Sequence, residues 1–234
     1  MGGKNVKITI VEKVLSLLAP HYCYSCGKTG LVLCDNCKYD ISFDPFYGCC
    51  LCASPNINGV CASHHAPFER SFIVSTRQGS IKACIDAFKF HNVKAAAAPL
   101  ANLLKSRLPL IPKSAVLVPI PTSSPHIRQR GYDQTLLLAK QLATGLNTPL
   151  KQLLERSSNA TQHLAASKKI RKQQAAQAFS LSESNQIIKG QLYILIDDII
   201  TTGSTVSEAA HLITNAGGRV WVAALAYQPA AEPA

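Results

Sequence analysis

The chain has 234 residues, 47% of them apolar, which predicts one sizeable folded domain with a small appendage. It contains no run of eighteen apolar residues, so no membrane-spanning helix is predicted. The formal net charge of +11 is concentrated in residues 71–180, where 16 basic and 3 acidic side chains give +13. Such a field favours phosphate-rich partners.

Residues 1–20 are predicted to form an amphipathic helix. Val11, Val14, Leu15 and Leu18 recur at helical spacing and would share one face. The apolar part of this stretch is short, and no small-residue cleavage site follows it, so the pattern does not indicate a signal peptide.

Eight of the nine cysteines fall between residues 23 and 61, mostly as C-x-x-C pairs. Such a pair places two thiolates on one tight turn, and two pairs complete a tetrahedron around Zn²⁺. Residues 21–66 are therefore predicted to form a zinc ribbon with one or two structural ions. The first ligand set is Cys23, Cys26, Cys34 and Cys37, and the second is Cys49, Cys52, Cys61 and His64.

Alternatives remain open for these cysteines. His65 is a second choice for the last ligand, and Cys50 is a spare thiol that competes for the second site. A disulfide framework is the main alternative to zinc, but it needs an oxidising compartment, and no export signal is found. The ninth cysteine, Cys84, lies within a helical pattern and is predicted to be a core residue.

The middle of the chain alternates strand and helix patterns. The predicted elements are a strand at Phe68–Thr76, helices at Gln78–Phe90 and Lys94–Arg107, a strand at Ala115–Ile120 and a helix at Leu136–Leu146. Ile120, Pro121 and Thr122 then form a stiff turn, which Arg128 and Arg130 follow. Arginine forks grip phosphate oxygens bidentately, so this segment is a predicted diphosphate site, with a solvated loop as the alternative.

Residues 157–179 are polar and basic, with Lys168, Lys169, Arg171 and Lys172 as the densest cluster of charge. This cluster is predicted to contact the phosphates of single-stranded nucleic acid. A flap over the neighbouring ligand site and an ordinary solvated helix face are the alternatives. Aromatic residues make up only 6% of the chain, which provides few platforms for stacked bases.

One stretch near the C-terminus organises the rest of the chain. Tyr193–Ile196 is predicted to be a buried strand of a parallel sheet, with Asp197 and Asp198 at its carboxyl end. A helix is predicted from Ser207 to the glycines at positions 217 and 218, and a closing strand at Arg219–Tyr227. The turn between the acids and the helix contains Thr201, Thr202, Gly203, Ser204 and Thr205.

This strand–turn–helix pattern suits a sugar phosphate. Ligands of open α/β sheets bind beyond the carboxyl ends of strands, where a helix N-terminus attracts phosphate. The acid pair would accept hydrogen bonds from sugar hydroxyls beside it. A nucleotide hydrolase whose acids hold Mg²⁺ is the alternative, but it needs a G-x-x-x-x-G-K-[ST] loop, which this sequence lacks.

The thirteen residues from Tyr193 to Thr205 match, position for position, the signature of type I phosphoribosyltransferases. The resemblance implies an α/β fold over residues 67–234, a parallel sheet with helices on both faces, that binds 5-phosphoribosyl-1-diphosphate (PRPP) with Mg²⁺. Asp197 and Asp198 would contact the ribose hydroxyls and form the catalytic pair. Residues 201–205 would cradle the 5′-phosphate, and residues 120–122 would contact the diphosphate.

Over nearly its full length the chain resembles the ComF family of competence-associated proteins. The shared features are the cysteine ribbon, Lys89, Pro119, Pro121, Arg128, Arg130, Gly131, Gln162, Arg171, Phe179 and the Asp-Asp-Ile-Ile-Thr-Thr-Gly signature. The departures are Tyr132 for Phe, Asp133 for Asn, Gln174 for Asn, and His64 where the last zinc ligand is often Cys. The family implies a bacterial cytoplasmic protein that acts in the uptake of transforming DNA with machinery at the inner membrane. It also adds Lys89 to the PRPP-binding residues.

Two functional classes follow from these patterns. In the first, the fold binds PRPP as part of a DNA-uptake factor, and the basic surface holds single-stranded DNA. In the second, the protein is an active phosphoribosyltransferase that transfers phosphoribose from PRPP to a nitrogen base or amine. Aligned substrates and neutralised charge would supply most of the rate in that case. We expect the first class.

Overall fold

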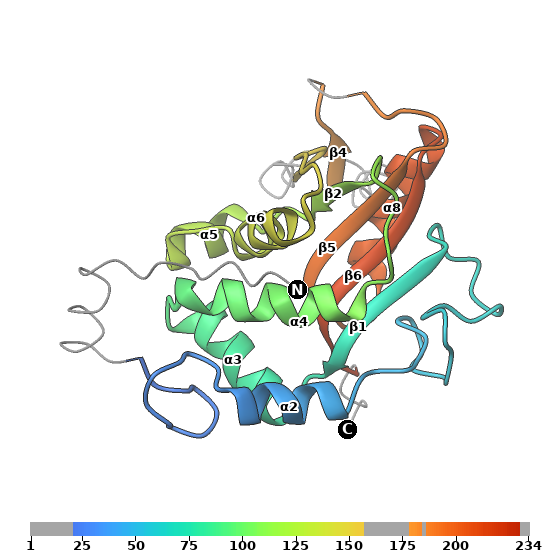
Figure 1. Ribbon diagram of the computed structural model, residues 1–234. Coiled ribbons are helices and arrows are strands. Elements are labelled where there is room, and N and C mark those ends of the chain that lie inside the picture. Colours follow the sequence, from blue (N-terminus) through green and yellow to red (C-terminus); the bar gives the residue numbers. More distant parts are fainter. Residues whose placement is uncertain (1–20, 157–177, 184–185, 230–234) are drawn as a thin grey trace, which may run out of the picture.

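The structure is a computed structural model that describes residues 21–156, 178–183 and 186–229 (Figure 1). The predicted N-terminal helix and the basic cluster of Lys168, Lys169, Arg171 and Lys172 lie outside these residues. The helices are α2 (Asp35–Phe43), α3 (Gly79–Phe90), α4 (Ala97–Arg107), α5 (Ser124–Arg130), α6 (Gln134–Leu146) and α8 (Ser204–Asn215), with a 3₁₀ turn η1 (Lys94–Ala96) before α4. The strands are β1 (Arg70–Thr76), β2 (Val116–Pro119), β3 (Leu154–Arg156), β4 (Phe179–Leu181), β5 (Leu192–Ile200) and β6 (Arg219–Tyr227).

Four of these strands form one parallel sheet in the order β1-β6-β5-β2, and β3 pairs with β4 in a separate antiparallel ladder. The two central strands, β5 and β6, are buried along almost their whole length. Continuous burial is typical of a parallel strand whose two faces are both covered by helices. The predicted parallel sheet with helices on both faces is confirmed.

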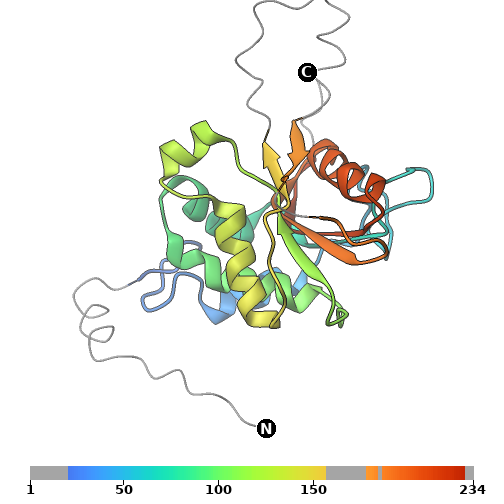
Figure 2. The same cartoon turned by 90° about the horizontal axis from the view of Figure 1, so that it is seen from above.

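Alternate residues of β5 point into two separate cores. Ile194 and Ile196 join the core beneath α3, α4 and α6, whereas Tyr193 and Leu195 join the core beneath α8. Figure 2 shows the red α8 on one side of the sheet and the yellow α6 on the other. A slip of one residue would exchange the two sets of side chains, so their burial fixes the register of β5.

The strand β5 is longer than its sequence pattern indicates. The apolar run ends at Ile196, but the strand continues through the acid pair to Ile200. The cause is β6, which pairs with β5 as far as Tyr227 opposite Ile200. On its other edge β5 has no β2 partner after Pro119 pairs with Ile196. The end of β5 therefore projects past β2 and leaves one edge open.

The predicted elements of the middle region are present with small shifts at their ends. One predicted element differs in helix type: the single helix predicted at Lys94–Arg107 begins with the 3₁₀ turn η1 and continues as α4. The elements α2, α5, β3 and β4 have no counterpart among the predictions. α5 has no buried residue, and β3 and β4 have three residues each, so these three elements show no apolar period.

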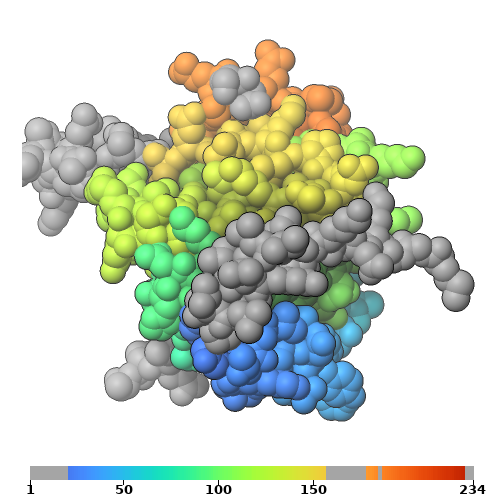
Figure 3. All heavy atoms as spheres, turned by 60° about the vertical axis from the view of Figure 1, so that its left-hand side comes forward, coloured from blue at the N-terminus to red at the C-terminus, as the bar shows by residue number. Residues whose placement is uncertain are grey.

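The cysteine-bearing segment, residues 21–66, packs against both cores. Val32, Leu33 and Ile41 belong to the core beneath α3 and α4, while Cys50 belongs to the core beneath α8. Figure 3 shows the blue atoms of this segment gathered at one end of the molecule. Among the helices in the described part of the chain, none is both long and apolar enough to cross a membrane.

Candidate functional site

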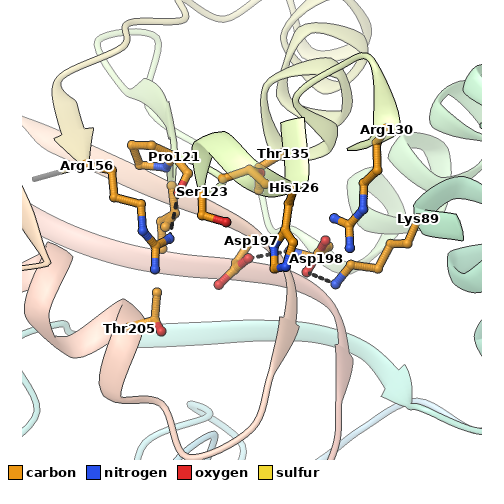
Figure 4. Close-up of a pocket in the computed structure, with 12 residues that line it drawn as sticks. Lys89, Pro121, Ser123, His126, Arg130, Thr135, Arg156, Asp197, Asp198 and Thr205 are labelled. Atoms are coloured by element: carbon orange, nitrogen blue, oxygen red, sulfur yellow. Dashed lines mark hydrogen bonds and ion pairs between the residues drawn. The ribbon is translucent and has the colours of Figure 1, made fainter. Parts of the chain in front are cut away.

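A cleft of about 240 Å³ opens where β5 projects past β2 (Figure 4). Of the residues predicted to bind PRPP, the cleft is lined by Lys89, Ile120, Pro121, Thr122, Arg130, Asp197, Asp198 and Thr205. The remaining predicted residues, Arg128, Thr201, Thr202, Gly203 and Ser204, do not belong to its lining. The lining also includes Ser123, His126, Thr135 and Arg156, which the sequence did not single out as ligand-binding residues.

The acid pair lies among the basic side chains of the cleft. Lys89 Nζ lies 2.9 Å from Asp198 Oδ1, and both side chains are largely buried. Asp197 Oδ1 accepts a hydrogen bond from the backbone N–H of Asp198 at 2.8 Å. Successive side chains of a strand diverge, so Asp198 faces Lys89 while Asp197 turns toward Thr205 and Arg156 (Figure 4).

The two acids differ in their surroundings. Burial and the adjacent charge of Asp198 raise the pKa of Asp197 to about 7, although part of the residue still reaches solvent. The N–H of Asp198 and the charges of Lys89 and Arg156 oppose this rise in pKa without cancelling it. Donors or cations from a ligand would stabilise the ionised carboxylate. The cleft is therefore suited to a ligand that carries hydroxyl groups or a metal ion.

The residues from Thr201 to Thr205, here called the 201–205 loop, join β5 to α8. Gly203 has a φ of +73°, a left-handed conformation that strains other residues, and it caps the N-terminus of α8. Thr205 lines the cleft, while Thr202 Oγ1 lies 3.0 Å from Ser204 Oγ beside it. The first N–H groups of a helix have no acceptor within it, so this end of α8 has donors from which an anion could accept hydrogen bonds.

The helix α5 explains why the two predicted arginines have different positions. His126 and Arg130 are four residues apart, so they share one face of the helix, and both line the cleft. Arg128 lies two residues from each of them and therefore projects elsewhere. Arg130 Nη1 donates to Gln134 Oε1 at 2.8 Å, which orients the guanidinium group. The helix ends at Gly131, whose φ is +74°.

Arg156 reaches the cleft from the end of β3, on the side opposite Lys89 (Figure 4). Its Nη1 donates to the carbonyl oxygen of Pro121 at 3.2 Å, and its guanidinium carbon lies 5.3 Å from the ring centre of Phe179 on β4. These contacts hold the side chain over the turn that follows β2. The sequence signal for this residue is weak, because it consists of one arginine at the start of a polar stretch.

The first predicted metal-ligand set gathers in the structure. The sulfur atoms of Cys23, Cys26, Cys34 and Cys37, called the first cluster, all lie within 4.8 Å of one another. The Sγ atoms of Cys26 and Cys34 are 3.6 Å apart. Four thiolates at about 2.3 Å from one zinc ion are about 3.8 Å apart, whereas a disulfide requires about 2.05 Å. The spacing fits a tetrahedral zinc site.

The second predicted set gathers in the same way. The ligand atoms of Cys49, Cys52, Cys61 and His64, called the second cluster, also lie within 4.8 Å of one another. Cys52 Sγ is 3.7 Å from Cys61 Sγ, and His64 Nδ1 is 2.9 Å from Cys61 Sγ and 3.9 Å from Cys49 Sγ. Between the two histidines that the sequence left open, the structure places His64 in the cluster.

Two further cysteines lie apart from the clusters. Cys50, the spare thiol of the ribbon, is fully buried in the core beneath α8, and burial raises its pKa to about 11. Cys84 is fully buried in the core beneath α3, where burial raises its pKa to about 12. The prediction that Cys84 is a core residue is confirmed, and neither thiol has the low pKa of a reactive cysteine.

Comparison with known proteins identifies the family. Over 203 residues the chain is 30% identical to Competence protein F of Haemophilus influenzae, and the match covers 82% of this chain and 87% of that protein. The chain belongs to the ComF family. This ComF protein is also 31% identical over 174 residues to DNA utilization protein YhgH of Salmonella typhi, with 70% of this chain and 75% of that protein covered.

A third relative is Competence protein ComFC of Bacillus subtilis, with 28% identity over 201 residues and 79% of each chain covered. A family model described as "Phosphoribosyl transferase domain" matches residues 133–234 of this ComF protein. That range includes α6, β5, the 201–205 loop, α8 and β6. The predicted ComF resemblance and the phosphoribosyltransferase domain are thereby confirmed.

The structure accounts for two of the departures from the usual ComF residues. Asp133 is the N-cap of α6, where its Oδ1 accepts from the N–H of Leu136 at 3.0 Å and from Thr122 Oγ1 at 3.1 Å. Asp and Asn are equally good N-caps, so the exchange keeps this role. The Tyr132 hydroxyl donates to the backbone carbonyl of Phe88 and ties this turn to α3. Gln174 lies outside the described residues.

Proposed function

We propose that this ComF protein binds PRPP with Mg²⁺ in the cleft. The observation that carries the proposal is one acid pair set among Lys89, Arg130 and Arg156, beside the N-terminus of α8. The acids would accept hydrogen bonds from the ribose hydroxyls, and the basic groups would neutralise the diphosphate. The 201–205 loop would hold the 5′-phosphate. Mg²⁺ prefers carboxylate and phosphate oxygens, so Asp197 and Asp198 would hold it beside the diphosphate and neutralise charge there.

Calorimetric titration with PRPP and Mg²⁺ tests this proposal. Asp197→Ala and Asp198→Ala should each lose hydrogen bonds to the ribose, at about 1–3 kcal/mol apiece. Asp40→Ala is the matched control, because Asp40 is an exposed acid on α2 and does not line the cleft. Wild-type affinity in both cleft variants would show that PRPP does not bind at this acid pair.

We further propose that the protein handles single-stranded DNA during natural transformation, in the cytoplasm and together with uptake machinery at the inner membrane. Its relatives named Competence protein F and DNA utilization protein support a role in DNA handling. The charge supports it independently, because residues 71–156 alone carry 12 basic and 3 acidic side chains. Contacts from such a surface to phosphates release counterions, so binding should weaken steeply with salt.

The basic cluster that the sequence singles out gives the test. A variant with Lys168→Glu, Lys169→Glu and Lys172→Glu should lose strand binding in a gel-shift assay while its affinity for PRPP is nearly kept. Each lysine removed from a phosphate contact should lower the logarithmic salt slope by roughly one. If the variant still shifts an oligonucleotide at low salt with the wild-type slope, the cluster is not the DNA surface.

An active phosphoribosyltransferase is the second candidate function. Three basic side chains line the place where diphosphate would leave, which is the arrangement that stabilises developing negative charge. In such a transfer the bond between the ribose carbon and the diphosphate breaks, a nitrogen acceptor forms the new bond, and diphosphate departs. Incubation with PRPP and a panel of bases and amines distinguishes the two functions, because only the enzyme releases diphosphate at a rate that depends on the acceptor.

Finally, we propose that both clusters hold structural Zn²⁺. The support is that the four ligand atoms of each cluster lie within 4.8 Å of one another and are of the types that Zn²⁺ prefers. Each set has four protein ligands, so no position remains for a catalytic water. The ions would fix the loops of the cysteine-bearing segment, which has only one helix, α2, among its described residues. Elemental analysis of the purified protein should find two zinc ions per chain.

A further inference from the structure

The turn between two members of the second cluster touches the 201–205 loop. Leu51 lies between Cys49 and Cys52, two members of that cluster, and its side chain reaches the left-handed turn at Gly203. A methyl group placed on Gly203 would lie only 2.1 Å from Leu51 Cδ2 and 3.5 Å from the carbonyl oxygen of Cys50. The loop therefore closes against this cysteine turn with no room for a side chain.

The turn from Cys49 to Cys52, called the cysteine turn, is held by backbone hydrogen bonds. The backbone N–H of Cys50 donates to the carbonyl of Gly59 at 2.8 Å, and the N–H of Ala53 donates to the carbonyl of Cys49 at 2.8 Å. Leu51 is half-buried and packs with Cys50 against the core beneath α8. When the two flanking cysteines share one metal ion, the backbone on both sides of Leu51 is fixed, and with it the surface that supports the loop.

The first cluster has different neighbours. Its buried cysteines belong to the core beneath α3 and α4, on the other face of the sheet from α8. Its cysteine turn contacts α3, where Ser25 Oγ lies 2.8 Å from Ser80 Oγ. Leu31, in the loop of this cluster, lines a groove against α4. The two clusters therefore make different contacts with the same domain, and they serve as internal controls for each other.

We propose that metal bound at the second cluster positions the 201–205 loop through Leu51, so that zinc affinity and phosphate affinity are coupled. This inference rests on the proposed PRPP site, and it makes Leu51 a positioning residue of that site. Coupling between two binding sites is reciprocal. PRPP must therefore raise the zinc affinity of the second cluster by the same factor by which zinc raises the affinity for PRPP. A coupling of about tenfold is expected, in the range typical of two coupled sites.

The first experiment removes the contact between Leu51 and the loop, and it keeps every residue that is proposed to bind zinc or PRPP. The zinc-loaded full chain is titrated with PRPP and Mg²⁺ in a calorimeter, as wild type and as Leu51→Ala, Leu51→Val and Leu31→Ala. Leu51→Ala should bind PRPP about tenfold more weakly. Leu51→Val keeps more of the side chain and should lose less PRPP affinity. It tests the contact if the alanine variant does not fold. Leu31→Ala, a leucine beside the first cluster, should retain wild-type affinity.

The second experiment reads the same coupling from the metal side and does not depend on activity. The equilibrium partition of zinc between the protein and a chromogenic chelator is measured with and without saturating PRPP and Mg²⁺. PRPP should raise the affinity of wild type for one of the two ions by about tenfold, and it should have no such effect on Leu51→Ala. The ion that PRPP leaves unaffected is expected to be the one that Cys23→Ser removes.

The outcomes separate this inference from the proposed function. If wild type binds PRPP but Leu51→Ala and Leu51→Val bind it equally tightly, or if PRPP leaves zinc affinity unchanged, the coupling is refuted and the PRPP site stands. If wild type binds no PRPP, the proposed function is refuted and the coupling with it. An equal loss of PRPP affinity in Leu31→Ala would also count against a specific role for Leu51.

Discussion

Replacing Asp197 with asparagine should stabilise the protein without ligand at neutral pH. The pKa of Asp197 is raised from 3.8 to about 7 by burial and by the charge of Asp198. Between these pH values the folded state keeps a proton that the unfolded chain releases, so stability falls as the pH rises. Asparagine has nearly the same shape, keeps Oδ1 as the acceptor for the N–H of Asp198, and carries no charge.

The size of the effect follows from the difference in pKa. One pH unit corresponds to about 1.4 kcal/mol, so the rise to about 7 corresponds to at most about 4 kcal/mol. This value is an upper bound because Asp197 keeps some contact with water. The variant should gain stability over wild type progressively from about pH 4 to pH 7, and the gain should stay level above pH 7.

Urea unfolding of the zinc-loaded proteins at pH 5, 6, 7 and 8, followed by the fluorescence of the single tryptophan, Trp221, measures this gain. Ionisations that wild type and variant share cancel in the difference between their free energies of unfolding. Asp86→Asn is the control of opposite sign, because hydrogen bonds from Lys82 and Arg77 outweigh the effect of burial and lower the pKa of Asp86. That variant should be less stable than wild type throughout. A stability difference between Asp197→Asn and wild type that stays constant from pH 5 to 8 would refute the argument.

Three further predictions concern single residues. Asp133→Ala removes the N-cap of α6 and should lower the free energy of unfolding by about 1–2 kcal/mol relative to Asp133→Asn, and equal stability would mean that the cap contributes nothing. Cys84 should resist alkylation in the native zinc-loaded protein, because it is fully buried and its pKa is raised to about 12, and rapid labelling detected by peptide mapping would contradict this. Cys23→Ser should lose one zinc ion by elemental analysis, whereas a folded wild type without metal would remove the first zinc site altogether.

The sequence by itself determined the features that depend on local spacing. The apolar run at Tyr193–Ile196, followed by two acids and a glycine-containing turn, indicates a strand, a ligand site and a helix N-terminus, because each lies within a few residues of the next. The cysteine sets are equally local, since a C-x-x-C pair forms one turn. These patterns predicted the parallel sheet and the family resemblance, which later findings confirmed, and they predicted two ligand sets whose atoms gather in the structure.

Only the tertiary structure decided which side chains meet. Lys89 and Asp198 are 109 positions apart, and they pair because α3 and β5 bring their carboxyl ends to the same edge of the sheet. The helical form of α5 separates Arg128 from Arg130, and its residues show no burial pattern from which the sequence could reveal a helix. The contact of Leu51 with Gly203 has no local signal either. Such contacts depend on how the two cores pack against the sheet, and a periodicity within one element carries no information about its neighbours in space.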